Sequence, residues 1–237
     1  MINLTYAFQP IVDVNLQQVF SYEALIRSTD NKTPKEIYSG ISQKKLPHFD
    51  QCIREGAIKM AAQLGLKSNL NLNFISACLQ FSREYLLDTI NIFKENNLSI
   101  NQLIVEILEE DIIHDHVSFS KLINEFRGQG VKVAIDDFGA GYSGLNLLAS
   151  FQPDIIKLDM HLIRNIQEHG PRQAIIKAIL QICISLGIDV IAEGVETVEE
   201  YYWLKKNGIY LFQGYLFAKP EIECLPSFKL PDLADTV

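Results

Sequence analysis

Short apolar runs alternate with segments of helical periodicity from about residue 69 to residue 212. The runs contain few polar residues, which is typical of strands covered on both faces in a parallel sheet. Glycine follows several of the helical segments, at Gly128, Gly187 and Gly208, as expected where a helix ends. Repeated strand–helix units predict either a (β/α) barrel or an open doubly wound sheet.

The pattern assigns most of the chain to strands and helices. Strands are expected at 6–14, 19–26, 69–74, 102–107, 131–135, 154–158, 188–192 and 209–212, and helices at 50–64, 78–96, 117–127, 145–150, 173–186 and 197–206. The first two strands are joined by a short polar link and are expected to form an antiparallel hairpin. We expect residues 1–237 to form one domain, with 221–237 as a closing tail.

Length and charge limit the classes of function. A chain of 237 residues fits a single α/β barrel, which commonly needs ~200–250 residues. The 21 Lys and Arg against 29 Asp and Glu give a net charge of −8, which argues against a surface that coats DNA or RNA. No GxxxxGK[ST] loop of the kind that binds nucleoside triphosphates is present in the sequence.

The sequence also bears on the cellular compartment. It has no apolar run of the ~18 residues that a membrane span requires, and its first residues do not form a signal peptide. The four cysteines are far apart and form no CxxC pair, which favours free thiols in a reducing environment. We therefore expect a cytoplasmic protein.

Polar residues stand near the carboxyl end of nearly every expected strand. They are Glu23, Asn73, Glu106, Asp136, Asp137, Lys157, Asp159, Glu193 and Gln213. In a parallel barrel these ends converge on one mouth, where active sites are built. Six of the residues are carboxylates, and carboxylates crowded together need a counter-charge. Oxygen-rich clusters suit Mg²⁺, Mn²⁺ or Ca²⁺, and adjacent aspartates can bridge two ions.

Each of these residues has a simpler explanation when taken alone. Asp136 or Asp137 could cap a helix, and Glu23 could pair with Arg27. Asn73 could bond the backbone in a turn, and Lys157 could lie at the surface with its stem buried. Independent caps do not explain polar groups at the ends of so many strands, so the joint pattern favours a site.

Several segments resemble a known family. The most specific are Tyr-Glu-Ala-Leu-Ile-Arg at 22–27, Asp-Asp-Phe-Gly-Ala-Gly-Tyr-Ser at 136–143 and Ala-Glu-Gly-Val-Glu-Thr at 192–197. Shorter matches occur at 9–11, 72–74, 106–109, 156–159 and 213–215. In this order they resemble the EAL domain family, bacterial phosphodiesterases that convert cyclic di-GMP to linear pGpG. The resemblance covers about residues 3–220.

The resemblance implies a fold and a two-metal centre. The family fold is a modified TIM (β/α)8-type barrel with one antiparallel strand, which agrees with the expected hairpin. By resemblance, two divalent cations, Mg²⁺ or Mn²⁺, are held at the site, and Ca²⁺ is expected to inhibit. The implied ligands are Glu23, Asn73, Glu106, Asp136, Asp137 and Glu193, with Asp136 as the bridge. Glu23, Lys157 and Glu193 are the implied catalytic residues, and Lys157 orients or activates the attacking water.

Other residues are implied to serve the substrate or the loop after 137. The expected substrate contacts are Gln9, Leu25, Arg27, Asp159 and Gln213. Glu109 is implied to anchor the loop 138–143, and the loop and its support comprise Glu109, Phe138, Gly139, Gly141, Ser143 and Glu196. The chain departs from the family at Leu108, where threonine is usual, which bears on the loop geometry and removes no metal ligand.

Three functions follow as expectations. The first is metal-dependent hydrolysis of cyclic di-GMP, with a homodimer implied by the family. The second is a catalytically silent cyclic di-GMP receptor that acts through a protein partner, and the third is an interaction role without nucleotide. No cyclase motif or preceding sensor segment is seen in the sequence, so we expect a stand-alone enzyme or a domain excised from a longer protein.

Overall fold

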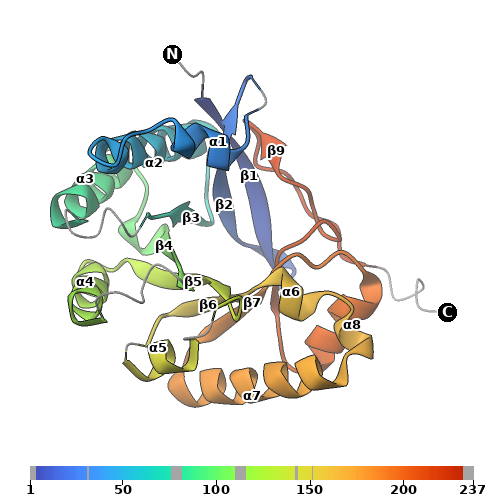
Figure 1. Cartoon of the computed structure of the whole chain (residues 1–237). Helices are drawn as coiled ribbons and strands as arrows, with labels where there is room; N and C mark the ends of the chain where they lie inside the picture. The colour runs from blue at the N-terminus through green and yellow to red at the C-terminus, as the bar shows by residue number, and fades with distance from the viewer. Residues whose placement is uncertain are drawn as a thin grey trace.

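The strands close into a barrel with helices around its outside (Figure 1). The computed structural model describes residues 4–30, 32–75, 82–109, 116–141, 144–150 and 152–231. The strands are β1 (Leu4–Asp13), β2 (Gln18–Ser28), β3 (Asn69–Asn73), β4 (Leu103–Leu108), β5 (Lys132–Phe138), β6 (Ile155–Leu158), β7 (Asp189–Ala192), β8 (Leu211–Phe212) and β9 (Glu221–Ile222).

The helices lie between the strands along the chain. They are α1 (Pro34–Ser39), α2 (Leu46–Gln63), α3 (Ser82–Glu95), α4 (His116–Gly128), α5 (Gly144–Ser150), α6 (Met160–Ile163), α7 (Gly170–Leu186) and α8 (Val198–Lys206). Short 3-10 turns lie at Ile100–Gln102 and Ile166–Glu168. Within the described ranges, no helix is long and apolar enough to cross a membrane.

The expected modified barrel is confirmed. Strands β2 to β8 pair in parallel in chain order, and β1 closes the barrel by pairing antiparallel with both β2 and β8. The expected hairpin is therefore the point where the barrel departs from an all-parallel arrangement. The short strand β9 also pairs with β1, at Ala7 and Phe8, so part of the closing tail extends the sheet.

The boundaries differ from expectation in a few places. Helix α1 was not expected, although Thr33 and Glu36 form a capping box around Pro34, which is a recognisable signal for a helix start. Helix α6 is a single turn, too short for periodicity to reveal. Residues 78–81 of one expected helix lie outside the described residues, and α3 begins at Ser82.

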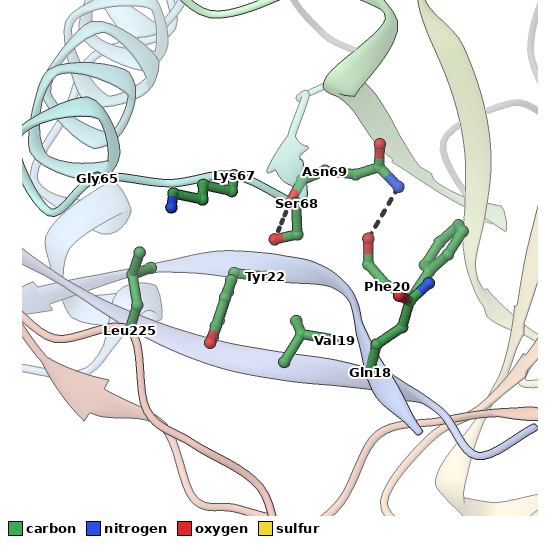
Figure 2. A pocket seen from close by; sticks show the side chains of 9 residues that line it. All are labelled: Gln18, Val19, Phe20, Tyr22, Gly65, Lys67, Ser68, Asn69 and Leu225. Atoms are coloured by element: carbon green, nitrogen blue, oxygen red, sulfur yellow. Dashed lines mark hydrogen bonds between the residues drawn. The ribbon is translucent and has the colours of Figure 1, made fainter. Parts of the chain in front are cut away.

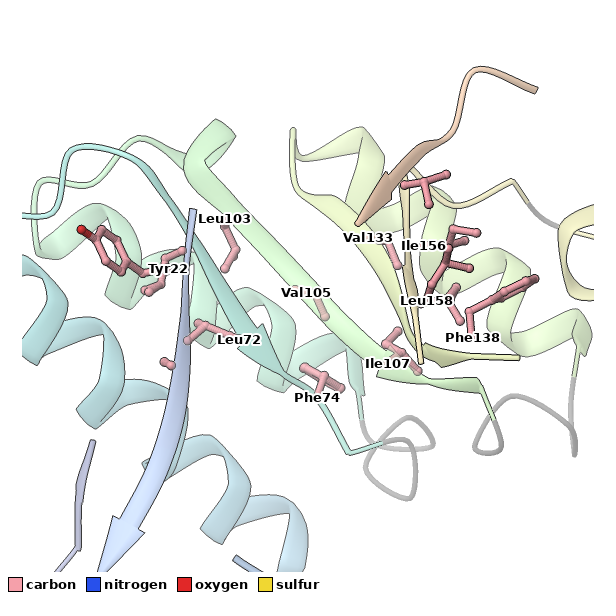
Figure 3. Packing of buried hydrophobic residues seen from close by; sticks show 14 of the residues in the cluster. Tyr22, Leu72, Phe74, Leu103, Val105, Ile107, Val133, Phe138, Ile156 and Leu158 are labelled. Atoms are coloured by element: carbon pink, nitrogen blue, oxygen red, sulfur yellow. The ribbon is translucent and has the colours of Figure 1, made fainter. Parts of the chain in front are cut away.

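Alternate residues of each strand pack on opposite faces, which divides the core in two. On the outer face, residues such as Val105, Ile107 and Ile156 pack beneath the helices (Figure 3). A second, separate cluster comprises Ile11, Ile104, Ala134, Ile155, Ile191 and Leu211, one from each of six strands. Because strand side chains alternate, this cluster fills the interior of the barrel, and the next interior layer lies two residues further along each strand.

Candidate metal centre

Many of the predicted site residues form the interior layer next to this apolar cluster. Five of them lie two positions after an interior apolar residue of a parallel strand, and Gln9 lies two positions before one on antiparallel β1. The pairs are Ile104 with Glu106, Ala134 with Asp136, Ile155 with Lys157, Ile191 with Glu193, Leu211 with Gln213, and Ile11 with Gln9. The strand period of two thus places these side chains together at the carboxyl end of the barrel.

Lys157 lies at the centre of this layer. Its side chain is 1% exposed, and its ammonium nitrogen is within hydrogen-bond or ion-pair distance of four carboxylates. The oxygen atoms are Oε1 of Glu193 at 2.7 Å, Oε1 of Glu106 at 2.8 Å, Oδ1 of Asp136 at 3.0 Å and Oε2 of Glu23 at 3.3 Å. Lys157 is therefore an interior cation, and the alternative of a surface lysine is wrong.

Two groups of carboxylates have the geometry of cation sites. Ligand oxygens of Glu23, Glu106 and Asp136 lie within 4.8 Å of one another, and so do those of Asp136, Asp137 and Glu193. Asp136 belongs to both groups. Oε2 of Glu106 is buried and has no hydrogen-bond partner within the described part of the chain. A buried unpaired carboxylate oxygen and two oxygen triads with a shared member fit a pair of hard divalent cations.

The charge balance of the layer supports the same conclusion. Burial and the charges of Glu23 and Asp136 raise the pKa of Glu106 to about 8, although Lys157 opposes the shift. Burial likewise raises the pKa of Glu193 well above its usual value. Burial alone would lower the pKa of Lys157, but the surrounding carboxylates outweigh it and raise that pKa. One ammonium cannot neutralise four carboxylates, so the layer holds protons or binds further cations.

A backbone irregularity lets two consecutive aspartates serve one site. In a regular strand, neighbouring side chains point to opposite faces. The register between β5 and β6 shifts between Ile135 and Phe138, and Asp137 has a φ of 53°, in the left-handed region. Partial desolvation and the charges of Asp136 and Asp159 raise the pKa of Asp137 to about 6. A left-handed aspartate is uncommon and strained, and such positions concentrate at functional sites.

Amide side chains orient the carboxylates. Gln213 donates through Nε2 to Oε2 of Glu23 at 2.7 Å, and Asn73 donates to Oε1 of the same residue at 3.3 Å. Asn71, which was not predicted, donates to Oε1 of Glu106 at 2.7 Å and is fully buried. The alternation Asn69-Leu70-Asn71-Leu72-Asn73 was the available signal, because it places the three asparagines on one face of β3.

A cavity of about 310 Å³ opens beside the carboxylates. Of the expected substrate contacts, it is lined by Gln9, Leu25, Asp159 and Gln213. Asp159 also caps α6 by accepting the backbone N–H of His161 at 2.8 Å. The exposed residue Tyr215 and the glycines Gly194 and Gly214 complete part of the wall and are not among the expected substrate contacts.

Arg27 lies away from this cavity. It lines a second cavity of about 520 Å³, which shares Glu23 and Leu25 with the first. Nη1 of Arg27 donates to the backbone oxygen of Ile26 at 2.9 Å, and the described residues show no ion pair between Arg27 and Glu23. The simple pairing considered for Glu23 is therefore not formed. Leu108, where the family usually has threonine, also lines the second cavity.

Glu109 holds the start of the loop that follows β5. Its Oε2 accepts the backbone N–H of Gly139 at 2.7 Å and that of Gly141 at 3.4 Å. Gly139 has a φ of +95°, in the left-handed region, so a residue with a Cβ would be strained there, and the Leu162 side chain would also have to move. Phe138 is buried beneath this loop, while Ser143 lies outside the described residues.

Glu196 lies on a different loop. It forms an ion pair with Arg164 at 2.9 Å, which lowers the pKa of Glu196, and it lines the cavity of about 310 Å³. Its backbone N–H donates to Glu200, the buried carboxylate at the start of α8. Glu196 therefore connects the segment after β7 to the end of α6, and it does not contact the loop after β5 through these bonds.

A further hollow of about 580 Å³ lies at the other end of β2 and β3 (Figure 2). It is lined by residues at the starts of these strands, including Gln18, Phe20 and Lys67, and Asn69 bridges the strands by donating to the Phe20 carbonyl at 2.8 Å. Its lining has no carboxylate and none of the predicted site residues. Size alone therefore does not locate the site, and the charged layer does.

Comparisons with known proteins agree with this geometry. Residues 2–220 match the sequence pattern of the EAL domain. In Escherichia coli strain K12, the blue light- and temperature-regulated antirepressor BluF is 38% identical over 98% of this chain, which spans 58% of BluF. The cyclic di-GMP phosphodiesterase PdeR of the same strain is 40% identical over 54% of this chain, which spans 20% of PdeR.

Two solved structures share the fold. A standalone EAL protein from Vibrio cholerae O395, in its cyclic di-GMP-bound form, has a TM-score of 0.89 and 39% identity, and the match covers 96% of both chains. A manganese and cyclic di-GMP complex of Klebsiella pneumoniae BlrP1 has a TM-score of 0.90 and 39% identity, over 95% of this chain and 57% of BlrP1. With the pattern matched over nearly its whole length, the chain belongs to the EAL domain family.

Proposed function

We propose that the chain hydrolyses one phosphodiester bond of cyclic di-GMP to give linear pGpG, with two divalent cations, Mg²⁺ or Mn²⁺. The observation that carries this proposal is the pair of carboxylate triads that share Asp136. Mg²⁺ and Mn²⁺ prefer such oxygen ligands. Two ions bound there would polarise the phosphodiester and lower the pKa of a water between them.

We divide the proposed ligand residues between the two cations. We assign Glu23, Asn73, Glu106 and Asp136 to one cation, and Asp136, Asp137 and Glu193 to the other. Lys157 faces four of these carboxylates, so we assign it the role of orienting the attacking water and keeping the ligand oxygens in place. Gln213 and Asn71 hold Glu23 and Glu106 in orientation.

The cavity beside the carboxylates is proposed to receive the nucleotide next to the scissile phosphate. Gln9, Leu25, Asp159 and Gln213 line it, together with Tyr215, a residue that is 56% exposed. An exposed aromatic ring offers a face for stacking on a base. Arg27, in the adjoining cavity, carries a guanidinium of the kind that binds phosphate in a bidentate manner.

A second function has one specific observation in its favour. BluF, which is similar to almost the whole chain, is named an antirepressor rather than a phosphodiesterase. A cyclic di-GMP receptor that acts through a protein partner is therefore the competing candidate. The complete set of carboxylates around Lys157 favours hydrolysis, because a receptor needs no shared cation ligands.

Turnover by the purified protein tests the two functions. We expect pGpG to accumulate by chromatography with Mg²⁺ or Mn²⁺ at slightly alkaline pH and not with a chelator. We expect Glu23→Ala to abolish turnover while the circular dichroism spectrum stays native. The matched control is Glu55→Ala, which removes an exposed carboxylate from α2.

Each outcome separates the candidates. Binding of cyclic di-GMP without turnover, in the presence of either metal, would establish the receptor and exclude hydrolysis. Substantial turnover by Glu23→Ala would contradict the ligand assignment. A loss of turnover in the control Glu55→Ala would show that the assay reports stability and not the site.

A further inference from the structure

A polar cluster is buried between α2, α3 and the end of β3, outside the proposed ligand set. It consists of Asp50, Gln51 and Arg54 of α2 and Thr89 of α3, each buried. The guanidinium of Arg54 donates to the carboxylate of Asp50, to Oε1 of Gln51 at 2.9 Å and to Oγ1 of Thr89 at 3.3 Å. We call these four residues the Arg54 cluster.

The Arg54 cluster holds the two residues that follow Asn73. The central carbon of the Arg54 guanidinium lies 4.1 Å from the centre of the Phe74 ring, a close cation–π contact. The backbone N–H of Ile75 faces the carboxylate of Asp50 and opposes the rise that burial causes in the pKa of that carboxyl. Two residues directly after β3 are therefore fixed from the side of α2.

The same short segment is fixed from the side of the barrel. The backbone N–H of Phe74 donates to the backbone oxygen of Glu106 at 2.9 Å, and Asn73 is paired in register with Glu106. The side chain of Asn73 reaches Glu23 at 3.3 Å. The residues 73–75 thus connect the Arg54 cluster to two carboxylates of the metal centre.

Asn73 needs such support. It is exposed, whereas Asn71 two residues earlier is fully buried. A buried charged pair usually gives little net stability compared with apolar side chains of similar volume, because both charges lose their hydration. Stability alone is thus a weak reason for placing Asp50 and Arg54 here, and their contacts with Phe74 and Ile75 supply a second one.

We propose that Asp50 and Arg54 are positioning residues that fix the segment 73–75 and thereby set the affinity of the metal centre for its cations. The inference rests on the proposed cation site, and it concerns residues outside the proposed ligand set. Outer partners of metal ligands commonly change affinity or activity by about 10–100-fold when they are removed.

The test uses a double variant that avoids an unpaired buried charge. Asp50→Asn with Arg54→Gln replaces the charged pair by two amides on the full chain. We expect Mn²⁺ to bind about 10–100-fold more weakly by titration calorimetry. In the metal-free protein we expect faster hydrogen exchange at the amides of Phe74 and Ile75, with little change at Leu70.

The matched control is Glu55→Gln with Lys59→Gln. This pair has the same i, i+4 spacing on the same helix, but its side chains are exposed and join at 2.5 Å. We expect Mn²⁺ affinity and hydrogen exchange to match the wild type. If the first double variant does not fold, Thr89→Val removes one hydroxyl, which accepts from Arg54 and donates to Gln51, and it should show a smaller change of the same kind.

The outcomes distinguish this inference from the proposed function. A folded double variant that binds Mn²⁺ within about twofold of the wild type would overturn it, as would exchange that speeds up equally throughout α2 and the barrel. Absence of Mn²⁺ binding by the wild type would overturn both proposals. Weaker Mn²⁺ binding by the variant, together with a wild type that hydrolyses no cyclic di-GMP, would support the positioning role and contradict hydrolysis.

Discussion

The ammonium nitrogen of Lys157 lies 2.7 Å from Oε1 of Glu193 in the interior of the barrel. Lys157 comes from β6, and Glu193 follows β7, so the contact joins two neighbouring strand ends. The same nitrogen also faces Glu23, Glu106 and Asp136. Lys157 thus partly offsets the charge of these four carboxylates.

Replacement of Lys157 by methionine tests whether its charge stabilises the carboxylate layer. Removing one partner of a buried ion pair commonly costs about 3–5 kcal/mol, because the other charge is left uncompensated. We expect the free energy of unfolding of Lys157→Met to fall by about this amount in a chelator, measured with urea. Mn²⁺ should restore more stability to the variant than it adds to the wild type. Equal stability of both proteins in the chelator would contradict the prediction.

The pH should affect the metal-free and metal-bound proteins in opposite ways. The pKa of Glu106 is raised to about 8 and that of Asp137 to about 6, whereas both carboxyls titrate near ~4 in an unfolded chain. Between these values the folded state binds more protons than the unfolded state. The free energy of unfolding contributed by these groups is therefore present at low pH and is lost as the pH rises to about 8.

Cation binding reverses this dependence, because ligands must lose their protons to bind a metal. We expect the melting temperature of the metal-free protein to fall between about pH 6 and about pH 8, and Mn²⁺ affinity to rise over the same range. Calorimetry in buffers of different ionisation enthalpy should show proton release at the lower pH and less at the higher pH. Proton release that is equal at both values would contradict the assignment.

Gln213 should affect Mn²⁺ binding and turnover by orienting Glu23. It donates to Oε2 of Glu23 at 2.7 Å and to Oε1 of Gln9 at 3.3 Å, so it links a proposed ligand to the cavity wall. We expect Gln213→Ala to weaken Mn²⁺ binding or lower turnover by about 10–100-fold with little change in fold. Gln213→Glu would add a negative charge to an acidic layer and should weaken the fold as well. Unchanged Mn²⁺ affinity and turnover in Gln213→Ala would refute the link.

The strand period accounts for much of what the sequence predicted. Residues two apart on a strand share a face, so the polar residues at successive strand ends had to meet once the barrel closed. The same rule, applied within β3, would have found Asn71. The irregularity at Asp137 could not be found this way, because a shift in register breaks the period on which the argument depends.

The contacts that the sequence did not reveal depend on tertiary packing. Arg54 bonds to Thr89, which lies 35 residues away on another helix, and contacts the ring of Phe74. Arg164 pairs with Glu196 across two loops. Neither pairing has a fixed spacing in the chain, because each depends on how α2 and α3, or α6 and α8, pack around the barrel. Whether a charged side chain is buried depends on this packing of helices, which the sequence pattern does not show.

Gly214 provides a last prediction, which joins backbone packing to the site. A Cβ at this position would lie 2.0 Å from the backbone oxygen of Val195, and backbone atoms cannot move aside as a flexible side chain can. Val195 also donates its N–H to the Gln213 carbonyl at 3.1 Å, so any shift reaches Gln213 and its bond to Glu23. We expect Gly214→Ala to lose about 1–3 kcal/mol of stability and to bind Mn²⁺ more weakly.

The control for this prediction is Gly128→Ala. Gly128 ends α4, and a Cβ there would meet no atom within 4 Å. Alanine is the better helix former, so the control should be as stable as the wild type or slightly more so. Urea unfolding of both variants, with and without Mn²⁺, measures the difference. If Gly214→Ala were as stable as Gly128→Ala and bound Mn²⁺ equally well, the close approach of Gly214 to Val195 would have no role in holding Gln213.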